Sequence, residues 1–242
     1  IIRQYANESN IKFIFLPNNE NLGYIKNYQR AFAACESDYI TIMEGDDFWN
    51  SRHHIQNHIA FLDNHSECSM CFNRHIRLFE DQYREEIPEW TGENNYQYFT
   101  TEQMIQGNKI GNLSCCTFRS ELIKKLDPHL FDLTFADWLL GMIMGQYGYL
   151  GYLEQVTSTY RIHDNGQWSR MSETEQTLKM ISQLKLYDKI LGYKYTRLFA
   201  RKIKSLEICL YGNRDLKDKI KHFVPDSLKK LYWKLKKKHD EQ

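Results

Sequence analysis

The first part of the chain alternates short apolar runs with segments of helical periodicity. Residues 11–16 are β-forming and are closed by Pro17, which predicts a strand. Between residues 24 and 35 apolar side chains recur every three or four positions, which predicts a helix. Residues 38–43 then read as a buried strand. A strand, a helix and a strand in this order indicate a parallel sheet within an α/β fold.

The same alternation continues to residue 162 and then gives way to helical periodicity. Further helices are predicted at residues 52–64, 101–106, 119–126 and 135–147, strands at 68–73, 75–79, 113–118, 149–153 and 156–162, and a loop at 81–98. After residue 169, Lys, Glu, Leu and Tyr recur at helical spacing, which predicts two or three helices. We therefore expect an α/β domain over residues 1–170 and a helical extension over residues 171–242.

Composition narrows the class of protein. The 242 residues include 32 basic and 31 acidic side chains, and a net charge of +1 provides no field for a polyanion, so nucleic acid is not an expected partner. Six irregularly spaced cysteines favour reduced thiols in the cytoplasm. Charged or polar residues interrupt each apolar stretch, so any membrane contact is expected to be peripheral.

An acidic turn, Glu44-Gly45-Asp46-Asp47, directly follows the predicted strand at residues 38–43. Open α/β sheets bind ligands at the carboxyl edge of their strands, where this turn is expected to lie. Clustered carboxylates supply the oxygen ligands that Mg²⁺ and Mn²⁺ prefer. A solvated turn and helix cap is the alternative interpretation, because Asp and Gly are common turn residues.

Several ordered motifs resemble those of bacterial family-two glycosyltransferases, which have the GT-A fold. They are Asn21-Leu22-Gly23, Asn27, Arg30-Ala31-Phe32, Glu44-Gly45-Asp46-Asp47-Phe48-Trp49, Gly111-Asn112, Phe118-Arg119, Ala136-Asp137-Trp138 and Tyr160-Arg161-Ile162-His163. The resemblance covers roughly residues 10 to 170. It implies a GT-A-like α/β fold, with a mixed sheet flanked by helices and followed by a helical tail.

The resemblance also implies a set of chemical roles. Asp47 would bind a Mn²⁺ or Mg²⁺ ion that bridges the donor diphosphate, His163 would complete the coordination of that ion, and Asp46 would lie near the ribose. Asp137 would deprotonate the acceptor hydroxyl, a task that suits a carboxylate within hydrogen-bond reach of the oxygen. The alternatives are a helix cap for Asp137 and a hydrogen-bonded structural histidine for His163.

Further residues are implied to bind the two substrates. Asn21, Gly23, Asn27 and Arg161 would contact the nucleotide sugar, and Gly111, Asn112 and Trp138 would lie near the acceptor. Turn chemistry explains most of these residues nearly as well, and Arg161 could instead pair with a surface carboxylate.

Three other patterns have simpler interpretations. Cys68 and Cys71 match a C-x-x-C motif, but without a second ligand pair they are expected to be core thiols. His54 and His58 are four residues apart on a predicted helix and are expected to form an exposed face. The basic segment 229–238 could contact an anionic membrane where lipid-linked acceptors reside, or could be a solvated terminal helix.

The sequence thus predicts an inverting enzyme that moves a sugar from a nucleotide sugar to a glycan or lipid-linked acceptor, in bacterial surface polysaccharide synthesis at the cytoplasmic side of the membrane. Relative to the family, the first strand, helix and strand are not found before Ile1, so we expect the chain to be N-terminally incomplete. An inactive glycan-binding module with the same fold is one alternative. A metal-dependent hydrolase or a glycosidase with two carboxylates is another.

Overall fold

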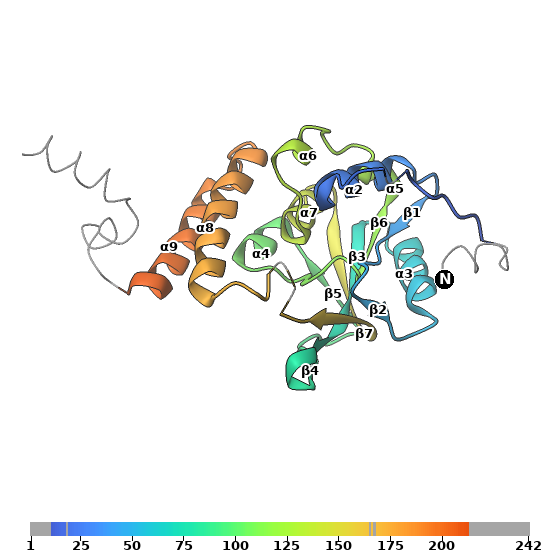
Figure 1. Cartoon of the computed structure of the whole chain (residues 1–242), viewed down its shortest axis with the longest axis horizontal. Coiled ribbons are helices and arrows are strands. Elements are labelled where there is room, and N and C mark those ends of the chain that lie inside the picture. Colours follow the sequence, from blue (N-terminus) through green and yellow to red (C-terminus); the bar gives the residue numbers. More distant parts are fainter. Residues whose placement is uncertain (1–10, 18, 165, 167, 213–242) are drawn as a thin grey trace, which may run out of the picture.

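A computed structural model of the chain describes residues 11–17, 19–164, 166 and 168–212 (Figure 1). The predicted basic segment 229–238 lies outside the described residues. None of the helices in the described part is both long and apolar enough to cross a membrane.

One mixed sheet forms the centre of the fold. Its strands are β1 (Tyr39–Thr41), β2 (Phe48–Trp49), β3 (Cys68–Phe79), β4 (Arg84–Glu86), β5 (Tyr96–Phe99), β6 (Cys116–Arg119) and β7 (Tyr149–Ile162). The main path runs β1-β6-β3-β7-β2, while β4 pairs with β3 and β5 pairs with β7. The long strands β3 and β7 are parallel, and the other described pairs are antiparallel.

Helices cover both faces of this sheet. They are α2 (Gly23–Ala33), α3 (His54–Asn64), α4 (Thr101–Gln106), α5 (Ser120–Ile123), α6 (Leu130–Leu133), α7 (Asp137–Met144), α8 (Glu173–Ile190) and α9 (Thr196–Tyr211), with a 3₁₀ turn at Glu80–Gln82. Leu62 of α3 packs with Cys68 and Cys71 in a small cluster, while Met70 and Phe72 of the same strand belong to the main core. Both cysteines are fully buried free thiols, as predicted.

The helices after β7 share the main core. Leu184 and Tyr187 of α8 and Phe199 of α9 are buried in the same cluster as Trp138 of α7. A capping box starts α8, because Ser172 Oγ accepts from Glu175 N at 3.3 Å and Glu175 returns a contact to Ser172 N at 2.9 Å. The helical region predicted after residue 169 is therefore confirmed as far as residue 211, while the domain boundary at residue 170 stays a prediction.

The predicted strand at residues 11–16 is wrong. This segment has no strand structure, and Ile11, Ile14 and Phe15 each expose half or more of their surface. An isolated strand leaves its backbone groups unpaired, and no described strand pairs with this segment. The parallel pair expected around α2 is therefore also absent among the described strands, since β1 pairs with β6 in antiparallel register.

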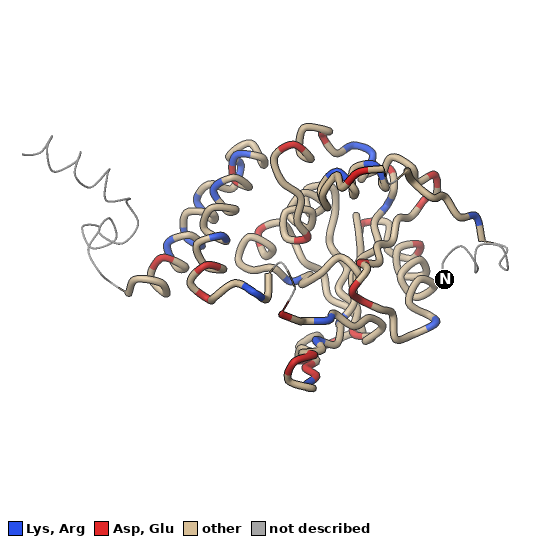
Figure 2. Tube along the Cα trace, in the orientation of Figure 1, with Lys and Arg blue, Asp and Glu red and all other residues tan. Residues whose placement is uncertain are grey.

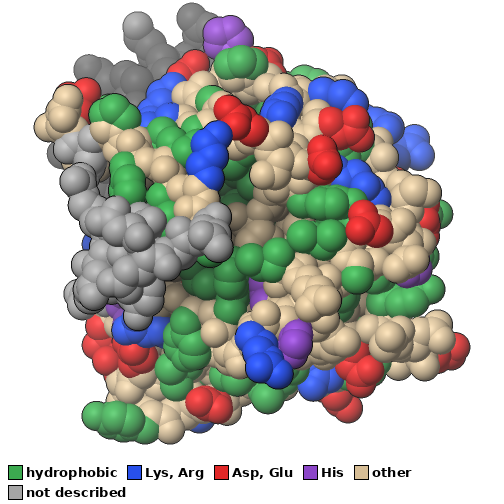
Figure 3. All heavy atoms as spheres, turned by 90° about the vertical axis from the view of Figure 1, so that its right-hand side faces the viewer, with side chains coloured by type: hydrophobic (Ala, Val, Ile, Leu, Met, Phe, Trp, Pro, Cys, Tyr) green, Lys and Arg blue, Asp and Glu red, His purple; other side chains and the backbone are tan. Residues whose placement is uncertain are grey.

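Other element boundaries differ because strand pairing overrides local pattern. The breaks predicted within β3 and β7 are absent, and the pairing of these strands instead shifts register around residues 73–75. The predicted loop at residues 81–98 contains the short strands β4 and β5. On the face that Figure 3 presents, acidic and basic side chains are interspersed, as a net charge of +1 leads one to expect.

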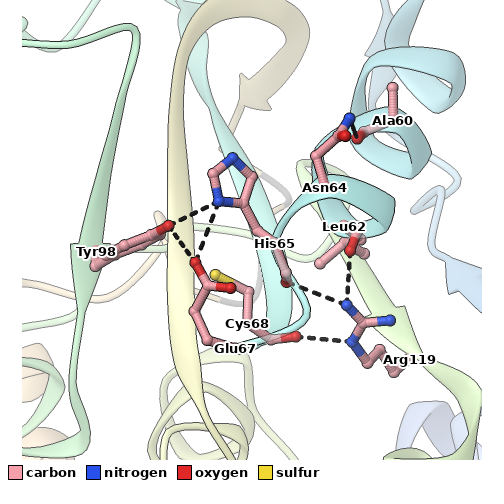
Figure 4. A network of polar contacts seen from close by, with 8 residues as sticks. All are labelled: Ala60, Leu62, Asn64, His65, Glu67, Cys68, Tyr98 and Arg119. Carbon is pink, nitrogen blue, oxygen red and sulfur yellow. Dashed lines mark hydrogen bonds and ion pairs between the residues drawn. The ribbon is translucent and has the colours of Figure 1, made fainter.

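A polar network fixes the end of α3 against the sheet (Figure 4). Arg119, the last residue of β6, donates to the carbonyl oxygens of Leu62 at 2.7 Å, His65 at 3.2 Å and Cys68 at 2.8 Å. Carbonyl groups at the end of a helix have no donor within the helix, and here the guanidinium group of Arg119 is their hydrogen-bond donor. Tyr98 of β5, a strand that pairs with β7, contacts both His65 and Glu67.

The exposed histidine face expected on α3 is also wrong, because His54 and His58 are both buried. Their rings are 4.3 Å apart, and His54 also stacks on Trp49 at 4.6 Å. The Nδ1 atoms of the two rings lie 2.8 Å from Thr157 Oγ1 and Thr117 Oγ1, respectively. These aromatic and threonine partners lie on three strands of the sheet, so helical spacing alone did not indicate which side α3 would bury.

The histidine pair predicts a loss of stability in mild acid. Burial lowers the pKa of His54 to about 4 and of His58 to about 3, below the ordinary value of 6.5. Below pH 6.5 the unfolded chain therefore binds more protons than the folded chain, and stability falls until the folded pKa is reached. At pH 5 we expect a loss on the order of 2 kcal/mol per histidine.

Denaturant unfolding at pH 7 and pH 5 measures this loss. His58→Gln is expected to remove part of the acid sensitivity, whereas His129→Gln, at an exposed histidine, is expected to leave it unchanged. Equal stability of the unmodified chain at the two pH values would contradict the burial argument.

Candidate functional site

The acidic turn lies on the connection between β1 and β2, where Figure 2 shows acidic positions near the middle of the molecule. The Asp47 amide donates to the Glu44 carbonyl oxygen at 3.2 Å, which closes the turn. Residues 112–114, just before β6, and the end of β7 both contact this turn. Three separate strands thus position the site.

Asp47 is held by three donors. Its Oδ2 accepts from Asn112 Nδ2 at 2.6 Å and from Ser114 Oγ at 2.7 Å, and its Oδ1 accepts from the Arg161 amide at 3.0 Å. Burial raises the pKa of the Asp47 carboxyl, and the hydrogen bonds from Ser114, Arg161 and Asn112 oppose that rise. A carboxylate offers about four acceptor positions, so one position on Oδ1 remains beyond these contacts.

Glu44 is part of the site, although the sequence assigned it no individual role. Its Oε1 accepts from Tyr28 OH at 2.8 Å, and its Oε2 accepts from the Leu113 amide at 3.3 Å. Burial raises the pKa of Glu44 to about 7, the charges of Asp47 and Asp137 act in the same direction, and the Tyr28 hydrogen bond opposes them. The available signal was the position of Glu44 at the end of a predicted strand.

Asp137 is the first residue of α7. Its Oδ2 accepts from Asn108 Nδ2 at 2.8 Å, and its Oδ1 lies 2.8 Å from the Trp138 amide. Burial raises the pKa of the Asp137 carboxyl, while the hydrogen bonds and the nearby His75 lower it. The helix-cap alternative is not supported, because Ala136 is the N-cap of α7 and no side chain caps this helix. The other oxygen of Asp137 faces the loop before β6.

The segment before β6 reaches both Asp137 and the acidic turn, because Asn108 donates to Asp137 while Asn112 and Ser114 donate to Asp47. Tyr160 of β7 directly precedes Arg161, whose amide donates to Asp47. Burial raises the pKa of the Tyr160 phenol to about 12, and the negative charges of Asp137, Asp47, Glu44 and Asp46 add to that rise in this order. The segment before β6 thus contacts both carboxylates on which the predicted chemistry depends.

His163 contacts Asp46 rather than Asp47. Its Nε2 lies 3.4 Å from Asp46 Oδ2, a weak contact at the exposed edge of the turn. Among the described residues, no group of three or more His, Cys, Asp or Glu side chains is arranged to hold a metal ion. The donor set still suits a hard cation that takes only one or two protein ligands and completes its shell with substrate phosphates, as Mg²⁺ does.

Four predicted substrate contacts have other partners. The Arg161 side chain pairs with Glu80 at 2.7 Å, which is the surface alternative. Trp138 is buried, and its Nε1 donates to the Met104 carbonyl oxygen at 2.6 Å, so its indole is a core side chain with no exposed face for an acceptor. Asn112 binds Asp47. Gly111 has a φ of +87° and lies so close to His75 that a Cβ would be 2.8 Å from the ring.

The predicted nucleotide segment lies at the start of α2. Asn21 Oδ1 accepts from the Gly23 amide at 2.9 Å, Gly23 has a φ of +74°, and Asn27 Oδ1 accepts from Arg30 Nε at 2.9 Å. These contacts fit the turn-chemistry alternative. The same helix reaches the acidic turn through Tyr28 and Glu44, so the segment lies beside the site, and its nucleotide role stays a prediction.

Solved structures share this fold. The crystal structure of S. aureus TarS 1-349 matches with a TM-score of 0.54 and 16% identity, over 90% of this chain and 62% of that one. A longer S. aureus TarS structure matches with a TM-score of 0.53 and 15% identity, over 93% of this chain and 37% of that one. The mixed sheet with flanking helices is thus the predicted GT-A-like fold.

Sequence comparison identifies the family. The uncharacterized protein Rv1520 of Mycobacterium tuberculosis and the uncharacterized protein Mb1547 of Mycobacterium bovis are each 24% identical over 171 residues, which is 69% of this chain. The chain spans about half the length of these curated relatives, at 47%. The sequence model of Glycosyl transferase family 2 matches residues 1–127, more than half of the chain. The chain therefore belongs to glycosyl transferase family 2.

Proposed function

We propose that this chain transfers a sugar from a nucleotide sugar to an acceptor hydroxyl with inversion at the anomeric carbon. The observation that carries the proposal is that the segment before β6 holds both carboxylates, since Asn108 donates to Asp137 Oδ2 while Asn112 and Ser114 donate to Asp47 Oδ2. In this proposal Asp137 acts on the acceptor hydroxyl, and the carboxylates of the acidic turn act on the nucleotide-sugar donor. A fold alone would not support this assignment.

Asp137 is the proposed general base. It takes the proton of the acceptor hydroxyl as the acceptor oxygen bonds to the anomeric carbon and the bond from that carbon to the diphosphate breaks. Asn108 holds one carboxylate oxygen in place at 2.8 Å, so little reorientation is needed during the reaction. Burial raises the pKa of Asp137 toward neutral pH, which makes it a stronger base.

The acidic turn is the proposed cation site on the donor side. Asp47, through its remaining position on Oδ1, and His163 are the proposed protein ligands, as the resemblance implied. Asp46 would orient His163 from its Nε2 side, the kind of carboxylate partner that metal-binding histidines commonly have. A bound Mn²⁺ or Mg²⁺ would neutralise charge on the departing diphosphate.

We propose that the donor nucleotide binds at the start of α2 and that the acceptor binds beside the loop before β6. Asn21, Gly23 and Asn27 would contact the nucleotide, and residues 108–112 would border the acceptor beside Asp137. A glycan or lipid-linked acceptor of bacterial surface polysaccharide synthesis, at the cytoplasmic face of the membrane, is the proposed substrate class.

A donor screen tests the proposal. The natural full-length protein is incubated with Mn²⁺ and a panel of UDP-, GDP-, dTDP- and CDP-linked sugars, with and without candidate glycan acceptors. We expect one donor to release its nucleoside diphosphate only when an acceptor is present. Release without any sugar transfer would indicate a hydrolase, and glycan binding without turnover of any donor would indicate a binding module.

A further inference from the structure

We propose that Ser114 is a positioning residue that fixes the Asp47 carboxylate for its role on the donor side. The inference rests on the proposed function and deepens its account of the site. Ser114 lies just before β6, contributes no charge, and belongs to none of the motifs that carried the family resemblance.

Ser114 connects the two ends of the acidic turn with Trp49 of β2. Its hydroxyl donates to Asp47 Oδ2 at 2.7 Å and accepts from the Glu44 amide at 3.0 Å, while its carbonyl oxygen accepts from Trp49 Nε1 at 2.9 Å. The residue is fully buried, so water does not compete for these contacts. One side chain thus bridges the first and last carboxyl-bearing residues of the turn.

The neighbours of Ser114 also hold the carboxylates of the acidic turn in place. Asn112 donates to the same Asp47 oxygen, and the Leu113 amide donates to Glu44 Oε2. These residues lead into β6, which pairs with β1 on one side and β3 on the other. The carboxylates of the turn are therefore held from a rigid strand in the centre of the sheet.

Loss of the Ser114 hydroxyl is expected to act mainly on turnover. Without this donor, Asp47 keeps Asn112 and Arg161 as partners but can rotate, and the Glu44 amide loses its acceptor. Correct orientation of a charged group matters most when charge develops on the leaving group, and less when the donor simply binds. The expected effect is a fall in kcat with little change in the donor KM.

Steady-state kinetics of Ser114→Ala, with the donor that the screen identifies, test this inference. We expect kcat to fall by about tenfold or more with the donor KM within about twofold of the unmodified protein. Ser120→Ala is the matched control, because Ser120 is also buried and follows β6 but its hydroxyl has no hydrogen-bond partner. That control is expected to retain full activity. Ser114→Thr, which keeps the hydroxyl, is expected to restore most of the turnover.

Thermal unfolding separates positioning of Asp47 from a general structural role. Ser114→Ala is expected to lower Tm more in the unmodified protein than in an Asp47→Ala background, because the second background lacks the shared contact. Equal Tm losses in both backgrounds, or an unchanged kcat, would overturn the inference while leaving the proposed function intact. Absence of transfer by the unmodified protein with any donor would overturn both.

Discussion

Replacement of Asp137 by asparagine is expected to lower the rate of sugar transfer by roughly 10²-fold to 10⁴-fold, the range typical for loss of a general base. The amide is nearly isosteric, and its oxygen can keep one of the two contacts, with Asn108 or with the Trp138 amide, but its NH2 group accepts neither the other contact nor the proton of the acceptor hydroxyl. Steady-state kinetics with saturating acceptor would measure the loss, and unfolding curves would show that the fold is retained.

The pH dependence of transfer sharpens this prediction. The base is active only when ionised, and burial raises the pKa of Asp137, so activity is expected to fall as the pH drops through that raised value. The residual activity of Asp137→Asn is expected to show no such fall at low pH. Asp38→Asn, at an exposed aspartate before β1, is the control and is expected to behave like the unmodified protein. An Asp137→Asn enzyme with more than a tenth of normal turnover would contradict the assigned base.

Replacement of Asp47 by asparagine is expected to lower kcat/KM for the donor by roughly 10²-fold or more. The substitution removes the negative charge that would hold the cation, while the side chain keeps nearly the same volume between Asn112, Ser114 and Arg161. Activity of the variant is expected to stay low over a wide range of Mn²⁺ concentrations. The unmodified protein is expected to lose activity in EDTA and to regain it with added Mn²⁺.

Asp46→Asn provides the comparison for this second prediction. Asp46 contacts His163 at the exposed edge of the turn, so its loss is expected to raise the Mn²⁺ concentration needed for half-maximal activity without abolishing transfer. Normal activity of Asp47→Asn, or full activity of the unmodified protein after chelation, would show that the acidic turn has another role.

The sequence pattern predicted those helices and strands whose stabilising residues lie within or directly beside the element itself. The bounds of α4 agree with the prediction, because Thr100 and Gln103 form a capping box and Gly107 follows the last turn. The segment at residues 11–16 failed because a strand depends on a partner that its own sequence does not reveal. His54 and His58 were misplaced for a similar reason, since their burial depends on threonines that are 103 and 59 residues away in sequence.

In the site, too, the sequence revealed some residues and missed those whose role depends on distant partners. Asp47 and Asp137 were found because a family resemblance marks their positions, and in the structure both accept hydrogen bonds from the segment before β6. Ser114 and Asn108 were missed because their functional meaning lies in contacts with carboxylates 67 and 29 residues away. Those contacts depend on the pairing of β1 with β6 and on the placement of α7, neither of which follows from residue spacing. Trp138 illustrates the converse, because a motif residue next to Asp137 is a core side chain.

The anomeric configuration of the product tests the central claim most directly. One transfer reaction with the donor found in the screen is followed by NMR of the anomeric proton in donor and product. A single displacement, in which Asp137 activates the acceptor opposite the departing diphosphate, predicts that an α-linked donor yields a β-linked product. Retention of the donor configuration would contradict the account.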